Sequence, residues 1–275
     1  MSEDTAAGWF RDIDPGDRES AREAIETGGA ETPAEWPALA VDAGFAADET
    51  EYYDRLHEAT VHAASEGSAE RERADDQQLV HAVRAMDDAS RTANELGERV
   101  AEWAGSLGWP EDADAVADRE PGTPVERRLV ALAERVRALE EEAATLRRHV
   151  ERTAPSVAPN LSALAGPVLA ARLVSLAGGL EVLAKKPSGT LQVLGAEDAL
   201  FAHLQGTAPS PKHGVIYTHE YVRGTAPGER GSAARALAGK LTIAARVDHY
   251  SGERRPTLDR ELESRIERIR ARGDA

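Results

Sequence analysis

The sequence contains no cysteine among its 275 residues. Disulfide bonds, thiolate metal sites and cysteine nucleophiles are therefore excluded, and their absence is consistent with a reducing compartment. Long apolar runs are also missing, because no stretch approaches the ~20 residues that a helix needs to cross a bilayer. The first residues, MSEDTAAGWF, are acidic and differ from a secretory or transit signal. We expect a cytoplasmic protein that does not associate with a membrane.

Aromatic residues make up only 4% of the chain and there are only four lysines, whereas Ala, Arg, Asp and Glu are abundant. This composition predicts a mostly helical fold. With 49 Asp and Glu against 33 Lys and Arg, the formal net charge is −16. Carboxylates keep a protein surface hydrated, so the composition favours the high-salt cytoplasm of a halophile, although any acidic protein would share the imbalance.

The charge is divided unevenly along the chain. Residues 1–160 contain 17 basic and 37 acidic side chains, whereas residues 161–275 contain 16 basic and 12 acidic ones. A chain divided in this way often has one part that meets an anionic partner. We expect that part to be the C-terminal one.

Residues 1–68 are predicted to form a small α/β domain. Turn signals at DPGD and TGGAETP separate helix-like pieces around 18–27 and 48–65. The aromatic residues of this segment could form either a small core or a docking face, and a core is favoured for most of them: Trp9, Phe10, Trp36, Phe45, Tyr52 and Tyr53.

Residues 69–153 are predicted to form a long antiparallel coiled-coil hairpin. Apolar residues recur in steps of four and three along its second arm, and the first arm has the same steps with smaller side chains. The second arm begins with TPVE, in which Thr123 is the expected N-cap and Glu126 closes a capping box. The predicted seam consists of Val125, Leu129, Leu132, Val136, Leu139 and Leu146.

A hairpin of this length cannot bury its second face alone. Each arm spans roughly 40 Å at ~1.5 Å per residue. We expect a second copy of the chain to pair with it along the seam, forming a homodimer. Two ordinary bundle helices are the alternative.

Residues 154–255 are predicted to form an α-helical domain, and residues 256–275 a basic tail helix. The first of these segments is rich in Ala and Leu and is interrupted by Gly and Pro, with short strands expected only near 190–194 and 214–217. In the tail, Leu262, Ile266 and Ile269 line one side of an Arg-rich helix.

Enzyme and cofactor signatures are missing. LAGKLT has no upstream glycine to form a phosphate-binding loop, and the glycines of GTAPGERG have the wrong intervals for a dinucleotide loop. The histidines of the C-terminal part lack the spacing and the thiolate partners of a metal site: His203, His213, His219 and His249. We predict that the chain is not an enzyme and holds neither a cofactor nor a metal.

The segment LQVLGAEDALFAHLQGTAPSPKHGVI, residues 191–216, is the best candidate for a binding site. Gly195 allows a sharp turn into a short helix, and Pro209 and Pro211 stiffen the loop that follows it. A stiff loop loses little entropy on binding, and the cation of Lys212 and the ring of His213 suit a phosphate and an unstacked base. The segment is therefore a candidate RNA site, with an ordinary surface turn as the alternative.

Three stretches resemble the Nop domain of the nucleolar box C/D ribonucleoprotein core proteins, and specifically their archaeal homologue. They are APNLSALAGPVLAARLVSLAGGLEVLAKKPSGTLQVLGAEDALFAHL, PKHGVIYTHEYV and RGSAARALAGKLTIAARVDHYSGE, and together they run nearly continuously from about 155 to 253. DDQQLVHAVRAMDDASRTANELGERVAEWAG extends the resemblance over the first arm of the hairpin. The acidic N-terminal segment resembles the family only loosely.

The resemblance implies a non-catalytic scaffold of a box C/D guide particle. In that family the N-terminal domain holds fibrillarin, the 2′-O-methyltransferase, and the coiled coil pairs two copies. The Nop domain binds a kink-turn guide RNA together with a small kink-turn-binding protein related to ribosomal proteins. The assembly methylates ribosomal or transfer RNA where the guide pairs.

The resemblance also implies which residues contact RNA or the particle. Gly195, Ala196, Glu197 and Phe201 match a GAxKxFF-like signature, beside which His203 lies. Lys212, His213 and Gly214 match a KHG loop. Arg230, Arg235 and Lys240 match the family's RG…AR…K…AAR helix. Asp198, Ala202 and Ser232 replace basic residues of the family. For Arg246 and Asp248, an internal ion pair and an RNA contact remain equal alternatives.

Two other functions stay open. A structural coiled-coil protein could use its Nop-like segment only to dock other proteins, and an RNA-modifying enzyme is the third hypothesis. At high salt the release of counterions contributes little to RNA affinity, so the loss of the three basic residues is consistent with binding by shape and stacking.

Overall fold

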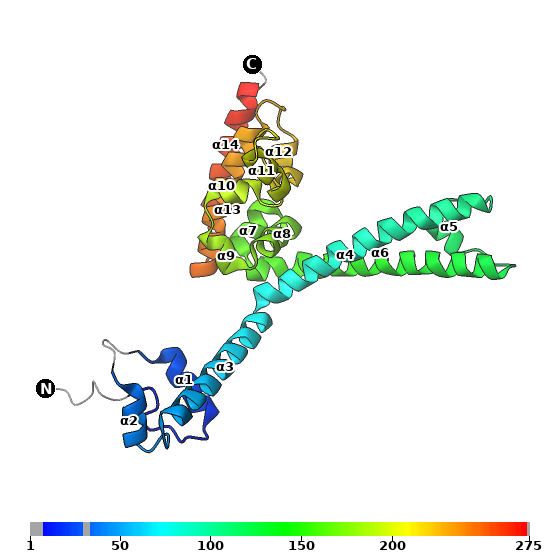
Figure 1. Cartoon of the computed structure of the whole chain (residues 1–275). Helices are drawn as coiled ribbons and strands as arrows, with labels where there is room; N and C mark the ends of the chain where they lie inside the picture. Colours follow the sequence, from blue (N-terminus) through cyan, green and yellow to red (C-terminus); the bar gives the residue numbers. More distant parts are fainter. Residues whose placement is uncertain (1–7, 30–33, 274–275) are drawn as a thin grey trace. The chain divides into compact units, whose positions relative to one another are not determined.

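The computed structural model describes residues 8–29 and 34–273, and its chain divides into two compact units, Met1–Ala74 and Asp75–Ala275. Helices are the regular elements of both units, and the described residues contain no strand. The mostly helical fold predicted from the composition is therefore confirmed (Figure 1).

The N-terminal unit consists of α1 (Arg18–Thr27), α2 (Trp36–Asp42) and α3 (Glu49–Arg73). The prediction of an α/β domain was wrong for the described residues, because the aromatic side chains pack between helices rather than on a sheet. Phe10, Phe45 and Tyr52 form the buried centre, and the rings of Phe10 and Phe45 stack at 5.4 Å. Tyr53 lies outside this core and is 52% exposed.

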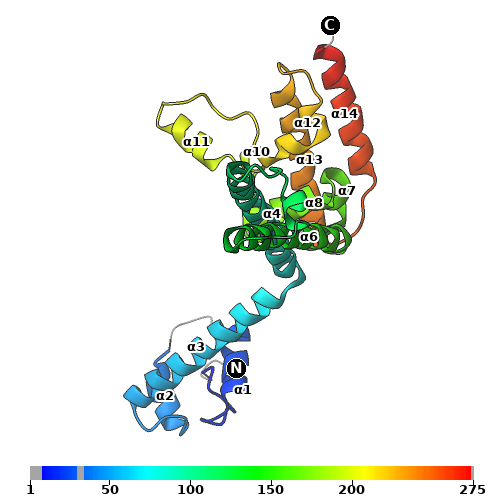
Figure 2. The same cartoon turned by 90° about the vertical axis from the view of Figure 1, so that its right-hand side faces the viewer.

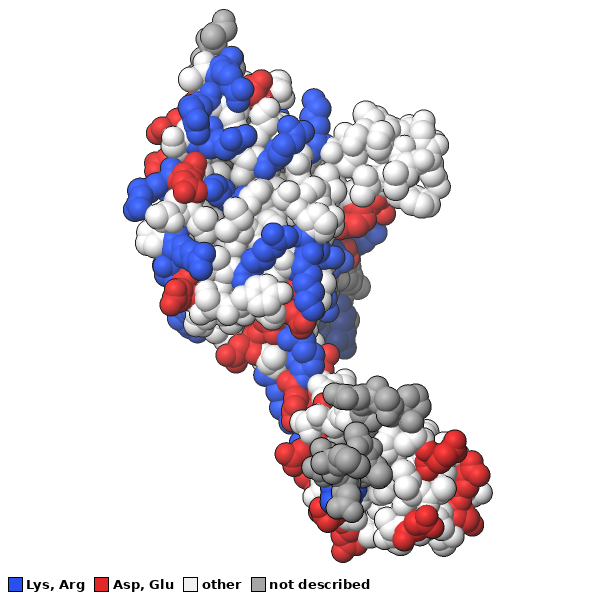
Figure 3. Space-filling model, turned by 90° about the vertical axis from the view of Figure 1, so that its left-hand side faces the viewer, with Lys and Arg blue, Asp and Glu red and all other residues white. Residues whose placement is uncertain are grey.

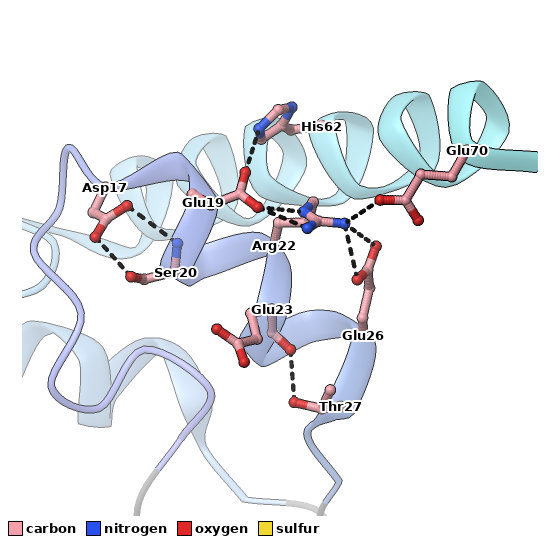
Figure 4. A network of polar contacts seen from close by, with 9 residues as sticks. All are labelled: Asp17, Glu19, Ser20, Arg22, Glu23, Glu26, Thr27, His62 and Glu70. Atoms are coloured by element: carbon pink, nitrogen blue, oxygen red, sulfur yellow. Dashed lines mark hydrogen bonds and ion pairs between the residues drawn. The ribbon is translucent and has the colours of Figure 1, made fainter. Parts of the chain in front are cut away.

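Arg22 holds α1 against α3 in the N-terminal unit (Figure 4). Its guanidinium lies 2.7 Å from Glu19 and 3.2 Å from Glu26 on α1, and 3.6 Å from Glu70 on α3. Hydrogen bonding to Glu19 raises the pKa of Arg22 above its ordinary value. One arginine thus gathers carboxylates that would otherwise repel each other in this acidic unit.

The C-terminal unit begins with a two-helix hairpin, formed by α4 (Asp75–Ser106) and α6 (Pro124–Val157), with the short α5 (Ala113–Ala117) between them. The predicted capping box is present, since Thr123 Oγ1 accepts from the Glu126 amide and the Glu126 carboxylate accepts from the Thr123 amide. Leu79 of α4 shares a cluster with Val150, and Val100 shares another with Leu129. These pairs confirm the antiparallel arrangement (Figure 1).

Most residues of the predicted seam pack against α4 of the same chain. Leu129 and Val136 are buried against α4, and Leu132 and Leu146 are partly buried in the same two clusters. Val125 is 50% exposed and stands at the start of α6. For Leu129, Leu132, Val136 and Leu146 the assignment to a contact between copies is therefore corrected, because they pack within the hairpin of one chain. Leu139 is partly buried, and Val125 is not covered. Pairing of two copies through the hairpin stays a prediction.

The rest of the C-terminal unit is a helical body, which we define as α7 to α14. Its elements are α7 (Pro159–Ala165), α8 (Pro167–Ala177), α9 (Leu180–Lys185), α10 (Ser188–Val193), α11 (Glu197–Leu204), the 3₁₀ helix η2 (Val215–Thr218), α12 (Glu220–Arg223), α13 (Arg230–Tyr250) and α14 (Thr257–Gly273). The strands expected near 190–194 and 214–217 were wrong, since α10 and η2 occupy these positions.

Helix α13 runs through the centre of the body. Its buried positions are mostly alanine, which lets the surrounding helices approach closely. Leu262, Ile266 and Ile269 of α14 complete this core, each being at most 2% exposed. The helix expected to be a tail is therefore packed into the body.

Asp248, near the end of α13, binds the start of α7. Its buried carboxylate accepts from the amide of Asn160 at 2.9 Å, the side-chain amide of Asn160 at 2.7 Å and the amide of Leu161 at 2.8 Å. Asp248 thereby satisfies the open amides at the start of α7. Arg246 donates to the carbonyl of Ala184 at 3.1 Å, so no ion pair with Asp248 is seen in the described chain.

Polar contacts join the hairpin to the body. Arg172 of α8 donates to Asp87 of α4 at 3.0 Å, and this bond raises the pKa of Arg172 above its ordinary value. Arg84 of α4 donates to Ser175 Oγ at 3.1 Å. Within the described residues no single helix is long and apolar enough to cross a bilayer, and the pair α7 and α8, which would qualify together, is bent by 118°.

Replacement of Asp248 by Ala should lower the free energy of unfolding by about 3 kcal/mol, because it leaves buried donors unpaired. Guanidinium unfolding followed by circular dichroism measures the change. Truncation of Glu134 to Ala, at an exposed position of α6, is the control and should change stability by less than about 0.5 kcal/mol. Equal effects of the two substitutions would contradict the role assigned to Asp248.

Candidate nucleic-acid interface

Residues 195–214, which we call the projecting segment, leave the helical body after α10 and return to it at η2. The segment contains α11, in which no residue is buried. Figure 2 shows α11 and its flanking loops standing away from the other helices of the body. The proline-containing loop that the sequence marked as a binding site is therefore on the surface.

Three hydrogen bonds, which we call the clasp, join the two ends of the projecting segment. The amides of Gly214 and Val215 donate to the carbonyls of Gln192 and Leu194, at 2.9 and 2.8 Å. The side-chain amide of Gln192 donates to the carbonyl of Lys212 at 2.7 Å. The clasp fixes where the projecting segment begins and ends, although α11 itself contributes no buried residue.

Two glycines make the clasp possible. A Cβ at Gly214 would lie 2.0 Å from the Leu194 carbonyl oxygen, a distance that no side chain can tolerate. Gly195 has a φ of +81°, a conformation that glycine adopts at no steric cost. Its amide donates to Glu197 Oε1 at 2.8 Å, so the Glu197 side chain provides the hydrogen-bond acceptor for this amide at the turn into α11. Ala196 is the residue immediately before that helix.

Lys212, His213 and Arg230 lie together at the base of the projecting segment. The ring of His213 stacks on Tyr217 at 4.6 Å, and the guanidinium of Arg230 lies 5.6 Å from the same tyrosine ring. A Cβ at Gly231 would lie 3.7 Å from Cδ of Lys212, so the lysine stem runs beside the start of α13. The arrangement offers a cation for phosphate and a stacked aromatic face for a base.

The far end of the projecting segment is uncharged. Residues 199–211 contain no Asp, Glu, Lys or Arg, and Phe201 and Leu204 are 63% and 75% exposed. In Figure 3 this end is the white lobe at the upper right, with acidic atoms at its base. His203 contacts the carbonyl of Ala208 at 3.0 Å through Nδ1 and thereby braces the loop after α11.

Two of the expected RNA contacts are placed differently from the others. Lys240 forms an ion pair with Glu261 of α14, so its charge is already compensated. Arg235 is exposed, and no ion pair involving it is seen among residues 8–29 and 34–273. A role of either residue in RNA binding stays a prediction.

An open groove of about 810 Å³ lies next to the clasp, between α4, α8 and η2. Arg84, Arg172 and Asp87 line one part of it, and Gly195, Gly214 and Tyr217 line another. Because Arg84 and Arg172 are bonded across the junction, the groove also connects the hairpin with the clasp. Within the described part of the chain no three His, Asp or Glu side chains gather as a metal site would require.

Tyr217 and Gln192 were missed by the sequence analysis. Tyr217 follows His213 by four residues, and this spacing was the one signal that could have indicated the stacked pair. Gln192 acts through an amide that donates across a gap of 20 residues, which no local pattern indicates.

His219 stabilises the short helix α12 of the helical body. Its Nδ1 accepts from the Tyr221 amide at 3.1 Å and so caps α12. Burial lowers the pKa of the His219 imidazole below its ordinary value. Protonation would remove the acceptor on which this cap depends.

Replacement of Gly214 by Ala should open the clasp, since the added methyl group collides with a backbone carbonyl that cannot rotate away. We expect a loss of about 2 kcal/mol or more in the free energy of unfolding, measured by guanidinium denaturation. Gly189→Ala is the matched control, because a Cβ there would meet nothing within 4 Å. A Gly214→Ala variant as stable as this control would show that the close approach is absent in solution.

The stability of the C-terminal unit should fall as the pH drops below about 6.5, the ordinary histidine value. The unfolded chain takes up a proton at His219 there, whereas the folded chain resists it until its own lower pKa is reached. Unfolding curves measured between pH 7.5 and 5 test this, with His219→Asn expected to flatten the dependence. Loss of the exposed His149 in His149→Asn is the control, and an unchanged pH dependence in His219→Asn contradicts the prediction.

Comparisons with known proteins match the part of the chain that contains the projecting segment. A family profile described as Nop, snoRNA binding domain, fibrillarin, matches residues 118–271, more than half of the chain. An uncharacterised NOP5 family protein of Methanocaldococcus jannaschii is 48% identical over 142 residues, which are 52% of this chain and 34% of that protein. Nucleolar protein 58 of Emericella nidulans is 33% identical over 216 residues, 63% of this chain and 37% of the relative.

A solved structure, titled as a fibrillarin/Nop5p complex, contains a chain with a similar fold. It covers 92% of this chain and 91% of its own, with a TM-score of 0.55 and 28% sequence identity. The chain spans about a third of the length of the curated relatives that it matches. Because the profile covers the second arm of the hairpin and nearly all of the helical body, the chain belongs to the Nop family.

Proposed function

We propose that the chain is a non-catalytic scaffold of an archaeal box C/D guide ribonucleoprotein. The observation that carries the proposal is the clasp, which presents Lys212 and the stacked His213 at the surface of a family-defined snoRNA-binding domain. The groove beside the clasp gives a bent RNA strand room to approach.

The proposed RNA is a kink-turn guide RNA, bound together with a small kink-turn-binding protein related to ribosomal proteins. The projecting segment suits a composite surface of this kind, since Lys212 is exposed at its base, where Glu197 and Asp198 also lie, and its far end is apolar. A protein partner can cover Phe201 and Leu204 while the RNA meets Lys212. Stacking on the His213 and Tyr217 pair then compensates for the basic residues replaced by Asp198 and Ala202.

Fibrillarin is the proposed partner of the N-terminal unit. The support is the similarity to the chain from the fibrillarin/Nop5p complex, which extends over 92% of this chain. Fibrillarin would supply the chemistry of RNA-guided 2′-O-methylation of rRNA or tRNA, because no catalytic constellation is evident in this sequence. Two copies would pair through the exposed faces of α4 and α6. The cytoplasmic location stays a prediction.

A second function is favoured by one observation, the exposed apolar pair Phe201 and Leu204. A structural coiled-coil protein could use this uncharged lobe to dock another protein without contacting RNA. The two functions differ in whether Lys212 and His213 contribute to binding.

Substitution of both Lys212 and His213 by Ala should weaken binding of a kink-turn guide RNA by about 10-fold or more, since it removes a phosphate contact and a stacking face. Binding is measured by fluorescence anisotropy with and without the kink-turn-binding protein. The melting temperature should remain that of the wild type, because both side chains lie outside the core.

Lys185→Ala combined with His149→Ala is the matched control, since it removes the same residue types from exposed positions elsewhere. This variant should bind as the wild type does. Wild-type protein that binds no kink-turn RNA, alone or with the partner, would favour the docking function. An equal loss of stability and binding in the Lys212 and His213 variant would make the loop structural.

A further inference from the structure

Helix α14 gathers three arginines on one side. At about 100° per residue, Arg265, Arg268 and Arg272 fall within an arc of about 60°. Glu263 and Glu267 lie at least about 100° away from each of them on the same helix. We call these three residues the arginine stripe, in a chain with a net charge of −16. Glu261, four residues before Arg265, is the acidic residue of α14 that lies on the same side.

The arginine stripe lines a groove of about 430 Å³, to which Ile269 is the other contributor among the residues that the structure describes. All three arginines are exposed, and none forms an ion pair with another described residue. Arg268 Nε donates to the carbonyl of Ser264 at 3.2 Å. Glu261, the acidic residue on the same flank, is compensated by Lys240.

The helix that carries the stripe is firmly held. Leu262, Ile266 and Ile269 are buried in the core of the body, so α14 cannot rotate about its axis and the arginine stripe keeps its orientation. Arg265 and Arg272 are seven residues apart, about 10 Å along the axis. Figure 3 shows Lys and Arg side chains gathered at the top of the body, over the C-terminal end of α14.

We propose that the arginine stripe binds the phosphodiester backbone of an RNA, as a contact separate from the projecting segment. Guanidinium groups bind phosphate through paired N–H donors, and unpaired arginines on a rigid helix suit this contact. The inference rests on the proposed function, because it assigns a second RNA surface to the same scaffold. The match to the snoRNA-binding family ends at residue 271 and includes Arg265 and Arg268.

An acidic protein segment is the competing occupant, and the groove suits it less well. Protein interfaces usually contain an apolar centre within a polar rim. Here the one apolar lining residue, Ile269, is 2% exposed and so offers almost no surface. A phosphodiester backbone needs only charge and donors, which the stripe supplies.

The test replaces Arg265, Arg268 and Arg272 by Gln in the full chain. Binding of a kink-turn guide RNA, with the kink-turn-binding protein present, is measured at several salt concentrations at which circular dichroism shows the native fold. We expect affinity at the lowest of these to fall by about 10-fold or more. The slope of log K against log salt should decrease by about 2 to 3, as expected for three lost phosphate contacts.

The matched control replaces Arg127, Arg128 and Arg135 of α6 by Gln. These three residues are also exposed and form no ion pair within the described chain, so the net charge changes equally. The control should bind within about 2-fold of the wild type. Wild-type affinity in the stripe variant, or equal losses in both variants, would overturn the proposal.

A plain RNA duplex without a kink-turn separates this inference from the proposed function. The wild type could fail to bind guide RNA but bind the duplex, with the stripe variant losing that binding. This result would support RNA binding by the arginine stripe and contradict the scaffold function. Failure to bind either RNA overturns both. Normal guide binding by the stripe variant overturns the stripe alone.

Discussion

The candidate RNA interface depends on the clasp between residues 192–194 and residues 212–215. Two backbone hydrogen bonds join the ends of the 20-residue projecting segment, and they form only because Gly214 has no side chain to keep the two backbone segments apart. No residue of α11 is buried. The chain thus combines a rigid base, where Lys212 and His213 stand, with a lobe whose apolar residues are available to a partner.

Several basic side chains form ion pairs that join helices. Arg22 draws carboxylates together in the N-terminal unit, Arg172 joins the body to the hairpin, and Lys240 fastens α13 to α14. Other cations form no ion pair with a described residue, and two groups of them carry the proposals made above. Lys212 lies at the clasp, and the arginine stripe lies along α14, so the two surfaces proposed for RNA are both on the helical body.

The sequence predicted those features whose cause is local. The capping box at Thr123 and the heptad steps of the hairpin depend on neighbouring residues, and both were confirmed. The strands near 190–194 and 214–217 were wrong because short apolar runs do not distinguish a buried helix from a strand. The contact between Asp248 and Asn160 joins residues 88 positions apart, and no pattern along the chain indicates it. For the same reason the sequence alone did not show that Lys240 forms an ion pair, because its partner Glu261 lies 21 residues further along the chain.

The central claim is that the clasp holds the projecting segment ready for a bent RNA. Amide hydrogen exchange, measured residue by residue with and without a kink-turn RNA and its binding protein, tests it most directly. The account predicts slow exchange at Gly214 and Val215 in the free protein, fast exchange at Ala208 and Ser210, and new protection of that loop when RNA is added. Fast exchange at Gly214 and Val215, or a loop that the bound RNA leaves unprotected, would contradict it.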